Sequence, residues 1–343
     1  MLAAEYVRNG MIEVVEADPR PPGPGEVQIA VAYVGICGTD LHILHGAMDE
    51  RVAQRAVIGH ETSGRIVAIG EGVTDWVAGG HVTVMPLRWC GTCPTCLAGH
   101  SHICDRLDFV GIDSPGSLQQ NWNVPQELLV PLPAGLSLRD AALVEPVAVA
   151  HHDVRRANLS PGQRVAVVGG GPVGLLIAVV AAAGGADVRV VEPDAFRRSL
   201  IAGLGFEVSE PVDGAIPALI DGWTGGSGAD VVFEVSGAQG GVDSAIELLG
   251  ARGRLVVVGI HAQPRQLDLK RVFWKELEIV GARVYEPQDF SAAVDSIAAG
   301  DIPVDALISQ VVPLDRAAEA FEVLAAGGSV MKVLVDCGGD DQS

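Results

Sequence analysis

Residues 164–192, RVAVVGGGPVGLLIAVVAAAGGADVRVVE, decide the fold of this chain. The run RVAVV is short and continuously apolar, as expected for a strand that a parallel sheet buries on both faces. A glycine-rich break and an apolar segment of helical length follow, and DVRVV then predicts a second strand. This order predicts a strand–helix–strand unit in which the two strands run parallel.

The glycines of this unit have the spacing of a pyrophosphate-binding loop. Gly169, Gly171 and Gly174 form G-x-G-x-x-G directly after the first strand and before the helix. The first glycine permits the tight turn, the second lets the backbone approach a pyrophosphate, and the third lets the helix lie close to the sheet. Glu192 ends the second strand about 20 residues later, where a carboxylate can accept hydrogen bonds from an adenosine ribose. The pattern therefore predicts a dinucleotide site.

The charge of Glu192 bears on the type of dinucleotide. A carboxylate repels a 2′-phosphate, so NAD is expected in preference to NADP, although Arg197 and Arg198 could offset the repulsion. The alternative interpretation is a glycine-rich turn in another α/β enzyme, with Glu192 a solvated strand end. We assign these further residues to the dinucleotide site: Pro172, Val173, Arg197, Ser236, Val258 and Gly259.

The same alternation of strands and helices continues toward residue 283. Apolar runs at 229–237, 253–260 and 276–283 alternate with helical segments, which predicts an α/β fold with a doubly wound parallel sheet. The chain before it is rich in short strands, such as the alternating segment 22–35, whereas helices and a final strand, MKVLVD, follow residue 284. We expect domains at 1–148 and 149–283, with 284–343 returning to the first of them.

Composition limits the classes of partner. The 43 acidic and 23 basic side chains give a net charge of −20, which repels nucleic acid. No apolar run approaches the roughly 20 residues that span a bilayer, so a membrane is not an expected partner. Met1–Gly10 has no basic start followed by an apolar stretch, so no secretory signal is visible and a cytoplasmic location is expected.

Four cysteines lie in one short lobe, at about 88–106. Their spacing is C-x₂-C-x₂-C-x₇-C, too tight for a disulfide framework in a chain of this length. Four thiolates can close a tetrahedron around zinc and leave no open position, which is typical of a structural site. An iron–sulfur cluster is the main alternative. The ligands would be Cys90, Cys93, Cys96 and Cys104.

A second group of ligand types is dispersed along the chain. Cys37 lies in GICGTDLH, His60 and Glu61 in GHE, and Glu145 in LVEP. A thiolate, an imidazole and a carboxylate can hold zinc and leave room for water or substrate, as a catalytic site requires. The alternative is a buried free cysteine, a core histidine and a surface glutamate.

These motifs together resemble a known family. GICGTDLH, GHETSGRIVAIGEGV, the four-cysteine lobe, LVEPVAVA and GGGPVG occur in the order found in the zinc-dependent medium-chain dehydrogenases, the alcohol and polyol dehydrogenases. The resemblance covers essentially the whole chain. It implies a GroES-like catalytic domain, completed by the C-terminal segment, and a Rossmann domain that binds NAD, with the active site in the cleft between them and a homodimeric or homotetrameric assembly.

The resemblance also implies roles for single residues. Cys37, His60 and Glu61 would bind a catalytic zinc, and Glu145 falls where sorbitol, butanediol and threonine dehydrogenases place a glutamate. Thr39 and His42 match the hydroxyl and the outer imidazole of a proton relay from the substrate. Zinc lowers the pKa of a bound hydroxyl from about 16 to about 7 for water, which suits loss of a hydride to nicotinamide.

These implications favour hydride transfer between NAD and a secondary alcohol of a polyol, sugar or vicinal diol. An L-threonine 3-dehydrogenase-like enzyme and a simple alcohol dehydrogenase are alternatives within the family. A metal-free NAD(P)H reductase of the same superfamily and a zinc-ribbon interaction module are alternatives from other classes. Metal content, NADH binding and a substrate panel discriminate among them.

Overall fold

The computed structural model describes residues 1–8, 10–212 and 214–339. The chain divides into two compact units. Unit 1 comprises Met1–Glu145 and Glu286–Ser343, and unit 2 comprises Pro146–Tyr285. The expected α/β class, a GroES-like β-rich part and a Rossmann-like parallel sheet, is confirmed. No helix among the described residues is long and apolar enough to cross a membrane.

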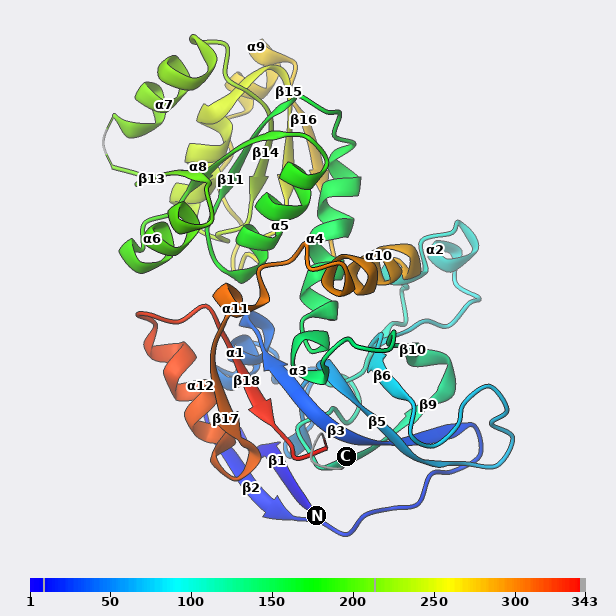
Figure 1. Ribbon diagram of the computed structural model, residues 1–343. Coiled ribbons are helices and arrows are strands. Elements are labelled where there is room, and N and C mark those ends of the chain that lie inside the picture. Colours follow the sequence, from blue (N-terminus) through cyan, green and yellow to red (C-terminus); the bar gives the residue numbers. More distant parts are fainter. Residues whose placement is uncertain (9, 213, 340–343) are drawn as a thin grey trace. The chain divides into compact units, whose positions relative to one another are not determined.

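A six-stranded sheet with the order β13-β12-β11-β14-β15-β16 forms unit 2, and every recorded pairing in it is parallel (Figure 1). Successive strands are connected through helices, as the alternating sequence predicts. The strands are β11 (Arg164–Val168), β12 (Asp187–Val191), β13 (Glu207–Ser209), β14 (Ala229–Glu234), β15 (Leu249–Val257) and β16 (Glu278–Gly281). The helices are α4 (Val144–Ala157), which begins at the boundary of the units, α5 (Pro172–Ala183), α6 (Ala195–Gly203), α7 (Ala215–Thr224), α8 (Gln239–Leu248) and α9 (Leu269–Lys275).

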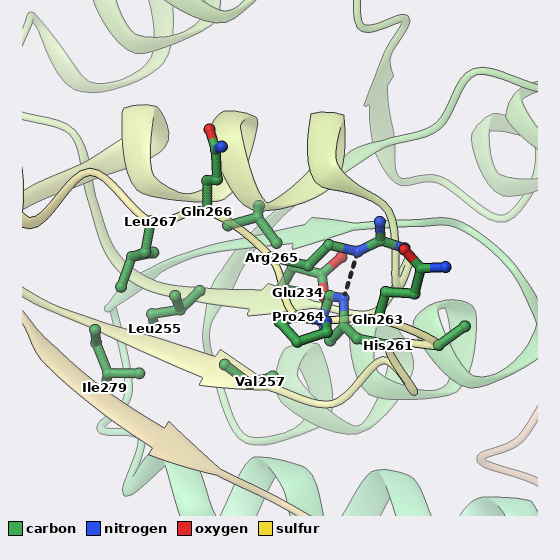
Figure 2. A pocket seen from close by; sticks show the side chains of 12 residues that line it. Glu234, Leu255, Val257, His261, Gln263, Pro264, Arg265, Gln266, Leu267 and Ile279 are labelled. Atoms are coloured by element: carbon green, nitrogen blue, oxygen red, sulfur yellow. Dashed lines mark hydrogen bonds and ion pairs between the residues drawn. The ribbon is translucent and has the colours of Figure 1, made fainter.

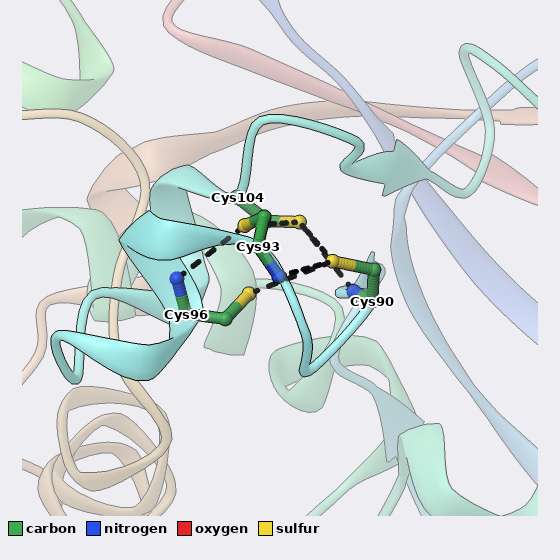
Figure 3. A group of neighbouring side chains, drawn as sticks. All are labelled: Cys90, Cys93, Cys96 and Cys104. Carbon is green, nitrogen blue, oxygen red and sulfur yellow. Dashed lines mark hydrogen bonds between the residues drawn. The ribbon is translucent and has the colours of Figure 1, made fainter.

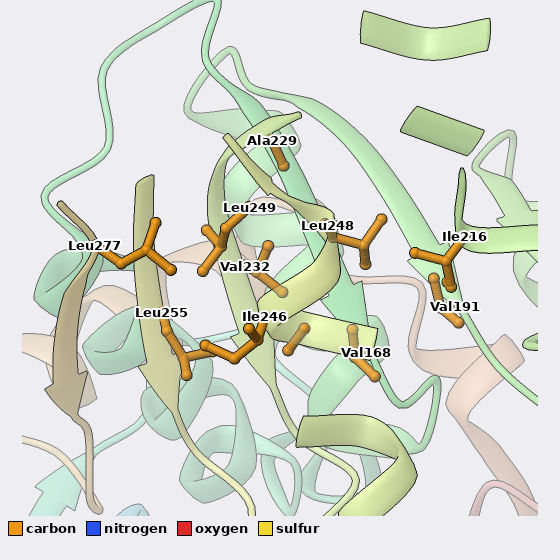
Figure 4. Close-up of a cluster of buried hydrophobic side chains, with 12 residues drawn as sticks. Val168, Val191, Ile216, Ala229, Val232, Ile246, Leu248, Leu249, Leu255 and Leu277 are labelled. Carbon is orange, nitrogen blue, oxygen red and sulfur yellow. The ribbon is translucent and has the colours of Figure 1, made fainter. Parts of the chain in front are cut away.

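Burial explains why the strands of unit 2 read as apolar runs. Val165, Val167 and Val168 of β11 are all buried, because helices cover both faces of a parallel sheet. On one face, α7 and α8 pack together and contribute Ile216 and Ile246 to a buried cluster with residues of β11, β12, β14 and β15 (Figure 4). This core fixes the carboxyl ends of β11, β12 and β14, which carry the candidate dinucleotide residues.

Unit 1 is built on a mainly antiparallel sheet. The strand order is β10-β6-β5-β3-β18-β17, with β9 also paired to β3. A three-stranded sheet β2-β1-β4 and a hairpin β7-β8 complete its strands. The bounds are β1 (Leu2–Tyr6), β2 (Ile12–Glu16), β3 (Glu26–Ile36), β4 (Ala56–Val57), β5 (Glu61–Ile69), β6 (His81–Val84), β7 (Leu87–Arg88), β8 (Asp108–Phe109), β9 (Asn121–Pro125), β10 (Leu129–Pro131), β17 (Ile308–Pro313) and β18 (Lys332–Asp336).

The C-terminal segment returns to the first part of the chain, as expected. Strand β18 pairs antiparallel with β3, with Val335 opposite Val34, and parallel with β17. The chain's last strand thereby lies between β3 and the edge strand β17 in the sheet of unit 1. The helices of unit 1 are α1 (Gly38–Leu44), α2 (Pro94–Leu97), α3 (Leu138–Ala141), α10 (Pro287–Ala298), α11 (Val304–Leu307) and α12 (Ala317–Ala326).

Some predicted boundaries differ from the structure. The strand expected at 276–283 is confined to Glu278–Gly281, because Leu269–Lys275 forms α9 and Glu276 is its left-handed C-cap residue. The strand expected at 253–260 begins earlier, at Leu249, and ends at Val257. The apolar side chains of the short helix α9 are exposed. They are therefore not confined to one buried face, and the sequence of α9 lacks the amphipathic pattern that would have predicted a helix.

Candidate functional site

Pairing of β3 with β5 brings the first candidate metal group together. Gly35 of β3 lies opposite Glu61, the first residue of β5. Cys37 follows β3 and caps the N-terminus of α1, while His60 directly precedes β5. The Sγ atom of Cys37 lies 3.2 Å from Nε2 of His60. Ligand atoms of Cys37, His60 and Glu61 all lie within 4.8 Å of one another.

This donor set fits a zinc ion. Tetrahedral zinc with bonds of about 2.3 Å to sulfur and about 2.1 Å to nitrogen separates these two ligand atoms by about 3.6 Å, close to the observed spacing. Burial raises the pKa of the Cys37 thiol. Burial by itself would lower the pKa of His60, but the charges of Cys37 and Asp40 raise it well above its usual value. A metal that binds here must displace the protons that these two side chains hold in its absence.

Asp40 contacts two of the candidate metal ligands without being a ligand itself, and our sequence interpretation did not include it. Its carboxylate is fully buried. Oδ2 accepts a hydrogen bond of 2.9 Å from the backbone N–H of Cys37, and Oδ1 lies 3.6 Å from Nδ1 of His60. A carboxylate on the far nitrogen of a ligating histidine fixes the tautomer and the orientation of the ring. The signal in the sequence was the aspartate three residues after Cys37.

We predict that Asp40→Asn weakens metal binding at this group by about 10- to 100-fold. The asparagine oxygen can still cap the N–H of Cys37, but the negative charge that faces His60 is gone. A chelator competition that measures the metal dissociation constant tests this, with Asp49→Asn, which changes a carboxylate bonded to Tyr6, as the matched control. Equal dissociation constants for Asp40→Asn and the wild type would reduce Asp40 to a helix cap.

Lys332 also belongs to this neighbourhood and was not predicted. Its Nζ lies 2.7 Å from both Oε1 and Oε2 of Glu61, and both side chains are almost fully buried. Burial by itself would lower the pKa of Lys332, but the negative charges of Glu61 and Cys37 raise it. The group is therefore an ammonium ion bound to one of the candidate ligands.

Glu145 is not a member of the group formed by Cys37, His60 and Glu61, whose ligand atoms lie within 4.8 Å of one another. It lies in the first turn of α4 and is buried, and its charge contributes to the raised pKa values of His60 and Lys332. Thr39 and His42 lie three residues apart on α1, on one face of the helix. Thr39 and His42 are both half-buried. Their roles remain proposals.

The four cysteines of the lobe converge on one point (Figure 3). The Sγ atoms of Cys90 and Cys96 are 4.0 Å apart, those of Cys93 and Cys104 are 3.7 Å apart, and those of Cys104 and Cys90 are 3.4 Å apart. Tetrahedral zinc with bonds of about 2.3 Å separates its sulfur ligands by about 3.8 Å. These spacings fit a structural zinc site.

Hydrogen bonds favour the thiolate form of Cys90 in this lobe. The backbone N–H of Thr92 is the main cause that lowers the pKa of Cys90 to about 5. The Sγ of Cys90 also accepts from the N–H of Cys93 at 3.3 Å and from Nη2 of Arg106 at 3.4 Å. Donors directed at sulfur stabilise the anionic form that a metal requires.

The glycines of unit 2 have the conformations that the motif requires. Gly169 has a φ of +107°, and a Cβ there would meet the backbone nitrogen of Ser236 at 3.0 Å. A Cβ on Gly174 would lie 1.8 Å from the carbonyl oxygen of Gly169, so only glycine allows α5 to start so close to the loop. Gly171 caps α5, and Pro172 and Val173 begin its first turn. The N-terminus of this helix offers free N–H groups to an anion.

Glu192 lies beside this loop and is buried. Its Oε2 accepts a 2.6 Å hydrogen bond from the backbone N–H of Gly170, and its Oε1 accepts a 2.7 Å hydrogen bond from the backbone N–H of Asp194. Each oxygen keeps a lone pair, so a ribose hydroxyl can still donate to the carboxylate. The guanidinium of Arg197 lies near the cap, because a Cβ on Gly171 would be 3.7 Å from its Nη1.

The other predicted dinucleotide residues gather at the end of β14. The N–H groups of Val258 and Gly259 both donate to the carbonyl oxygen of Glu234 at 2.9 Å. The carboxylate of Glu234 accepts from the N–H of Ser236 at 2.9 Å and lies 2.9 Å from Nε2 of His261. Glu234 and His261 also line a cavity of about 450 Å³ (Figure 2). Hydrogen bonds to Glu234 thus position Ser236, Val258 and Gly259. Our sequence interpretation did not include Glu234.

Comparison with known proteins places this geometry in a family. Residues 23–134 match the alcohol dehydrogenase GroES-like domain, and residues 172–299 match the zinc-binding dehydrogenase domain. The 2-dehydro-3-deoxy-L-galactonate 5-dehydrogenase of Pseudoalteromonas atlantica is 49% identical over 337 residues, which cover 98% of this chain and 99% of that protein. The sorbitol dehydrogenase of Halalkalibacterium halodurans is 33% identical over 94% of each chain.

Solved structures agree with these relatives. The 2R,3R-butanediol dehydrogenase from Bacillus subtilis superposes with a TM-score of 0.90 at 30% identity and covers 98% of this chain and 99% of its own. A Sinorhizobium meliloti 1021 protein solved with NADP gives a TM-score of 0.91 at 31% identity, with 98% of each chain covered.

The fold and the two thiolate-containing sites thus define a zinc-type alcohol dehydrogenase. The chain belongs to the zinc-dependent medium-chain dehydrogenase/reductase family. Within that family it is a polyol or diol oxidoreductase with sites compatible with a structural and a catalytic zinc.

Proposed function

We propose that this enzyme transfers a hydride between NAD and the secondary hydroxyl of a sugar acid. The observation that carries the proposal is the 49% identity to a 2-dehydro-3-deoxy-L-galactonate 5-dehydrogenase over nearly the whole of both chains. The L-galactonate-5-dehydrogenase of Escherichia coli, 33% identical over 88% of each chain, has a name that also specifies a sugar acid oxidised at carbon 5. An L-threonine 3-dehydrogenase-like activity is the second candidate from the sequence, and no contact among the described residues favours it.

The reaction divides into loss of a proton and loss of a hydride. In the oxidative direction, the alcohol gives its C–H hydride to nicotinamide and its O–H proton to the protein, which leaves a ketone and NADH. Zinc, when bound, supplies a Lewis acid that lowers the pKa of the alcohol. Cys37 and His60 supply the thiolate and the imidazole at that site, and Glu61 and Glu145 are its carboxylates.

The proton requires a path out of the site. The hydroxyl of Thr39 can accept a proton from the substrate while it donates its own toward His42, one helical turn further along α1. Histidine suits the outer end of such a relay because its unperturbed pKa is near 6.5. We therefore assign Thr39 and His42 to proton transfer.

Each unit has one part of this chemistry. We assign unit 1 to catalysis, with the structural zinc lobe at about 88–106, and unit 2 to dinucleotide binding. The boundaries inferred from sequence, 1–148, 149–283 and 284–343, lie within three residues of the boundaries between the units, at Glu145/Pro146 and Tyr285/Glu286.

We also propose that NAD is preferred to NADP. The carboxylate of Glu192 is held at the glycine loop by two backbone N–H groups, so its charge faces any phosphate on the ribose 2′-position. Arg197 near the cap offsets part of this repulsion.

Replacing Glu192 with alanine is therefore expected to weaken NAD binding and to reduce the preference for NAD over NADP by about 10- to 100-fold, since a lost charge-assisted hydrogen bond costs about 1.5–3 kcal/mol. The ratio of kcat/KM values for the two cofactors measures the effect. Glu210→Ala is the control, because Glu210 pairs with Arg198 at the neighbouring strand end. A wild type that already prefers NADP would contradict this role of Glu192.

A substrate panel tests the proposed activity. Initial rates with NAD are compared for sugar acids, sorbitol, 2,3-butanediol, L-threonine and simple alcohols. The proposal expects the highest kcat/KM with a sugar acid that has a secondary hydroxyl at carbon 5. A higher value with L-threonine or a neutral polyol would replace the sugar acid with that substrate.

We further propose a homodimer or homotetramer. Strand β16 is an edge of the sheet of unit 2, and its Ile279 is exposed. Helix α9 next to it exposes Phe273 and Trp274, each at 72%. An apolar surface at an open sheet edge is typical of strand pairing between subunits. Light scattering that gives a monomer mass of 35.5 kDa would contradict this assembly.

The cytoplasmic location also remains a proposal. All six cysteines are free thiols, and the four in the lobe are arranged for a metal. A reducing compartment keeps such thiols available for zinc.

A further inference from the structure

The proposed substrate carries a negative charge that the protein must accommodate. The net charge of the chain is −20, so its overall field repels an anion. Binding of a carboxylate therefore requires a local cation, and arginine suits this task because its planar fork matches the two carboxylate oxygens. In a sugar acid that reacts at carbon 5, the carboxylate is distant from the reacting hydroxyl. The cation should therefore lie near the metal group without being bound to one of its ligands.

The chain from β8 to β9 packs against one of the candidate metal ligands in unit 1. The ring of Phe109 meets the ring of His60 edge-on, with a distance of 5.2 Å between the ring centroids. The backbone N–H of Ser117 donates to the carbonyl oxygen of Gly59 at 3.0 Å. A Cβ on Gly111 would lie 3.2 Å from the Cβ of His60, so the two backbones approach closely. These contacts fix the connection between β8 and β9 beside His60.

Asp113 of this connection binds Arg51, which lies in the loop between α1 and β4. Its Oδ1 accepts a hydrogen bond of 3.0 Å from Nε of Arg51, and its Oδ2 accepts one of 2.7 Å from Nη2. Oδ2 also accepts from the backbone N–H of Phe109 at 2.9 Å. The backbone N–H of Arg51 donates to the carbonyl oxygen of Met48 at 2.9 Å. The guanidinium group of Arg51 is thus connected to His60 through Asp113 and Phe109.

The pairing with Asp113 leaves one end of the guanidinium group available. Asp113 occupies the side formed by Nε and Nη2, and no hydrogen bond from Nη1 of Arg51 occurs among the described residues. The end formed by Nη1 and Nη2 therefore keeps N–H groups in the fork geometry that binds both oxygens of a carboxylate. The side chain of Arg51 is 41% exposed, so a solute can reach this end. Lys332, in contrast, directs its donors to Glu61 and to the carbonyl oxygen of Ile36.

We propose that Arg51 binds the carboxylate of the substrate through its Nη1–Nη2 end and thereby selects a sugar acid over a neutral polyol. Asp113 is the positioning residue that holds the guanidinium group. An ion pair as exposed as this one contributes little to stability, so its two-bond geometry is better explained by positioning. The assignment rests on the proposed sugar acid activity and names the residue that recognises the anionic end of that substrate.

The experiment compares L-galactonate, a sugar acid, with sorbitol, a neutral polyol, as substrates of the full-length enzyme with NAD. Values of kcat and KM are measured for the wild type, Arg51→Met, Arg51→Lys and Asp113→Asn. A fluorescence titration of the enzyme–NADH complex with L-galactonate measures binding without turnover. Arg55→Met is the matched control, because Arg55 is another arginine of the same loop and pairs with Glu5 and Glu13.

Arg51→Met is expected to lower the ratio of kcat/KM for L-galactonate to kcat/KM for sorbitol by about 10- to 100-fold, the usual contribution of charge-assisted hydrogen bonds. The loss should arise mainly from a higher KM for L-galactonate, and the titration should show the same loss of affinity. Arg51→Lys keeps the charge without the fork, so the ratio should fall by a smaller factor. Asp113→Asn should also lower it, because the guanidinium group is held less firmly. Arg55→Met should keep the wild-type ratio.

The outcomes separate this proposal from the proposed activity. A wild type that prefers L-galactonate, with an unchanged ratio in Arg51→Met, would overturn the role of Arg51 and leave the sugar acid activity intact. A wild type that does not oxidise L-galactonate but binds it in an Arg51-dependent way would overturn the activity and support the anion site. Absence of both turnover and Arg51-dependent binding would overturn both. If Arg51→Met does not fold, an unchanged ratio in both Arg51→Lys and Asp113→Asn would overturn the proposal.

Discussion

Replacing Cys37 with serine is expected to abolish turnover and leave NADH binding unchanged. The substitution removes the thiolate that lies 3.2 Å from His60 Nε2, while the glycine loop that we assign to the dinucleotide belongs to unit 2. A Lewis acid contributes several kcal/mol to the stability of the transition state, so its loss corresponds to a decrease of about 10³-fold or more in kcat/KM. Initial rates and NADH fluorescence titration measure the two quantities.

Cys337→Ser is the control for this variant. Cys337 is also a buried free thiol, but it follows β18 and belongs to neither metal group. Its substitution should leave kcat/KM near the wild-type value. Full activity of Cys37→Ser would remove the catalytic zinc from our account, and loss of NADH binding in that variant would show that the substitution damages more than the metal site.

Replacing Cys93 with serine is expected to reduce the zinc content from two ions to one per chain and to unfold the lobe at 88–106. Cys93 is buried, caps α2 and lies 3.7 Å from the sulfur of Cys104. Structural zinc contributes about 10–16 kcal/mol to the folding of small zinc peptides, so a lobe with few apolar contacts depends on the metal. Metal analysis and hydrogen exchange of the lobe measure both effects.

The expected pattern is local. Hydrogen exchange should become faster in residues 88–106 and remain slow in β11 and β14. These two strands belong to the core of unit 2, whereas the lobe belongs to unit 1. Cys337→Ser serves again as the matched substitution of a buried thiol. Two zinc ions per chain in Cys93→Ser, or unchanged exchange in the lobe, would contradict a four-thiolate site.

Much of the fold could be predicted because its signals are local. The apolar run of β11, the glycine spacing before α5 and Glu192 at the end of β12 depend on backbone geometry over fewer than about 30 residues. The four cysteines lie within 15 positions, so their spacing alone predicts a metal site. The order of the motifs along the chain is also a feature of the sequence alone, and it is typical of the family.

The sequence by itself therefore determined the α/β class, the glycine loop, the cysteine lobe and the residue types of the second metal group. Only the tertiary structure decided that Asp40 faces His60, that Glu234 fixes the segments around Ser236 and Gly259, and that Lys332 holds Glu61 across 271 residues of chain. The physical reason is that side-chain periodicity follows from the local backbone, whereas the neighbour of a buried charge depends on which strands pair and in which register. The pairing of β18 with β3 brings Lys332 to the metal ligands, and no local pattern near Lys332 indicates that pairing.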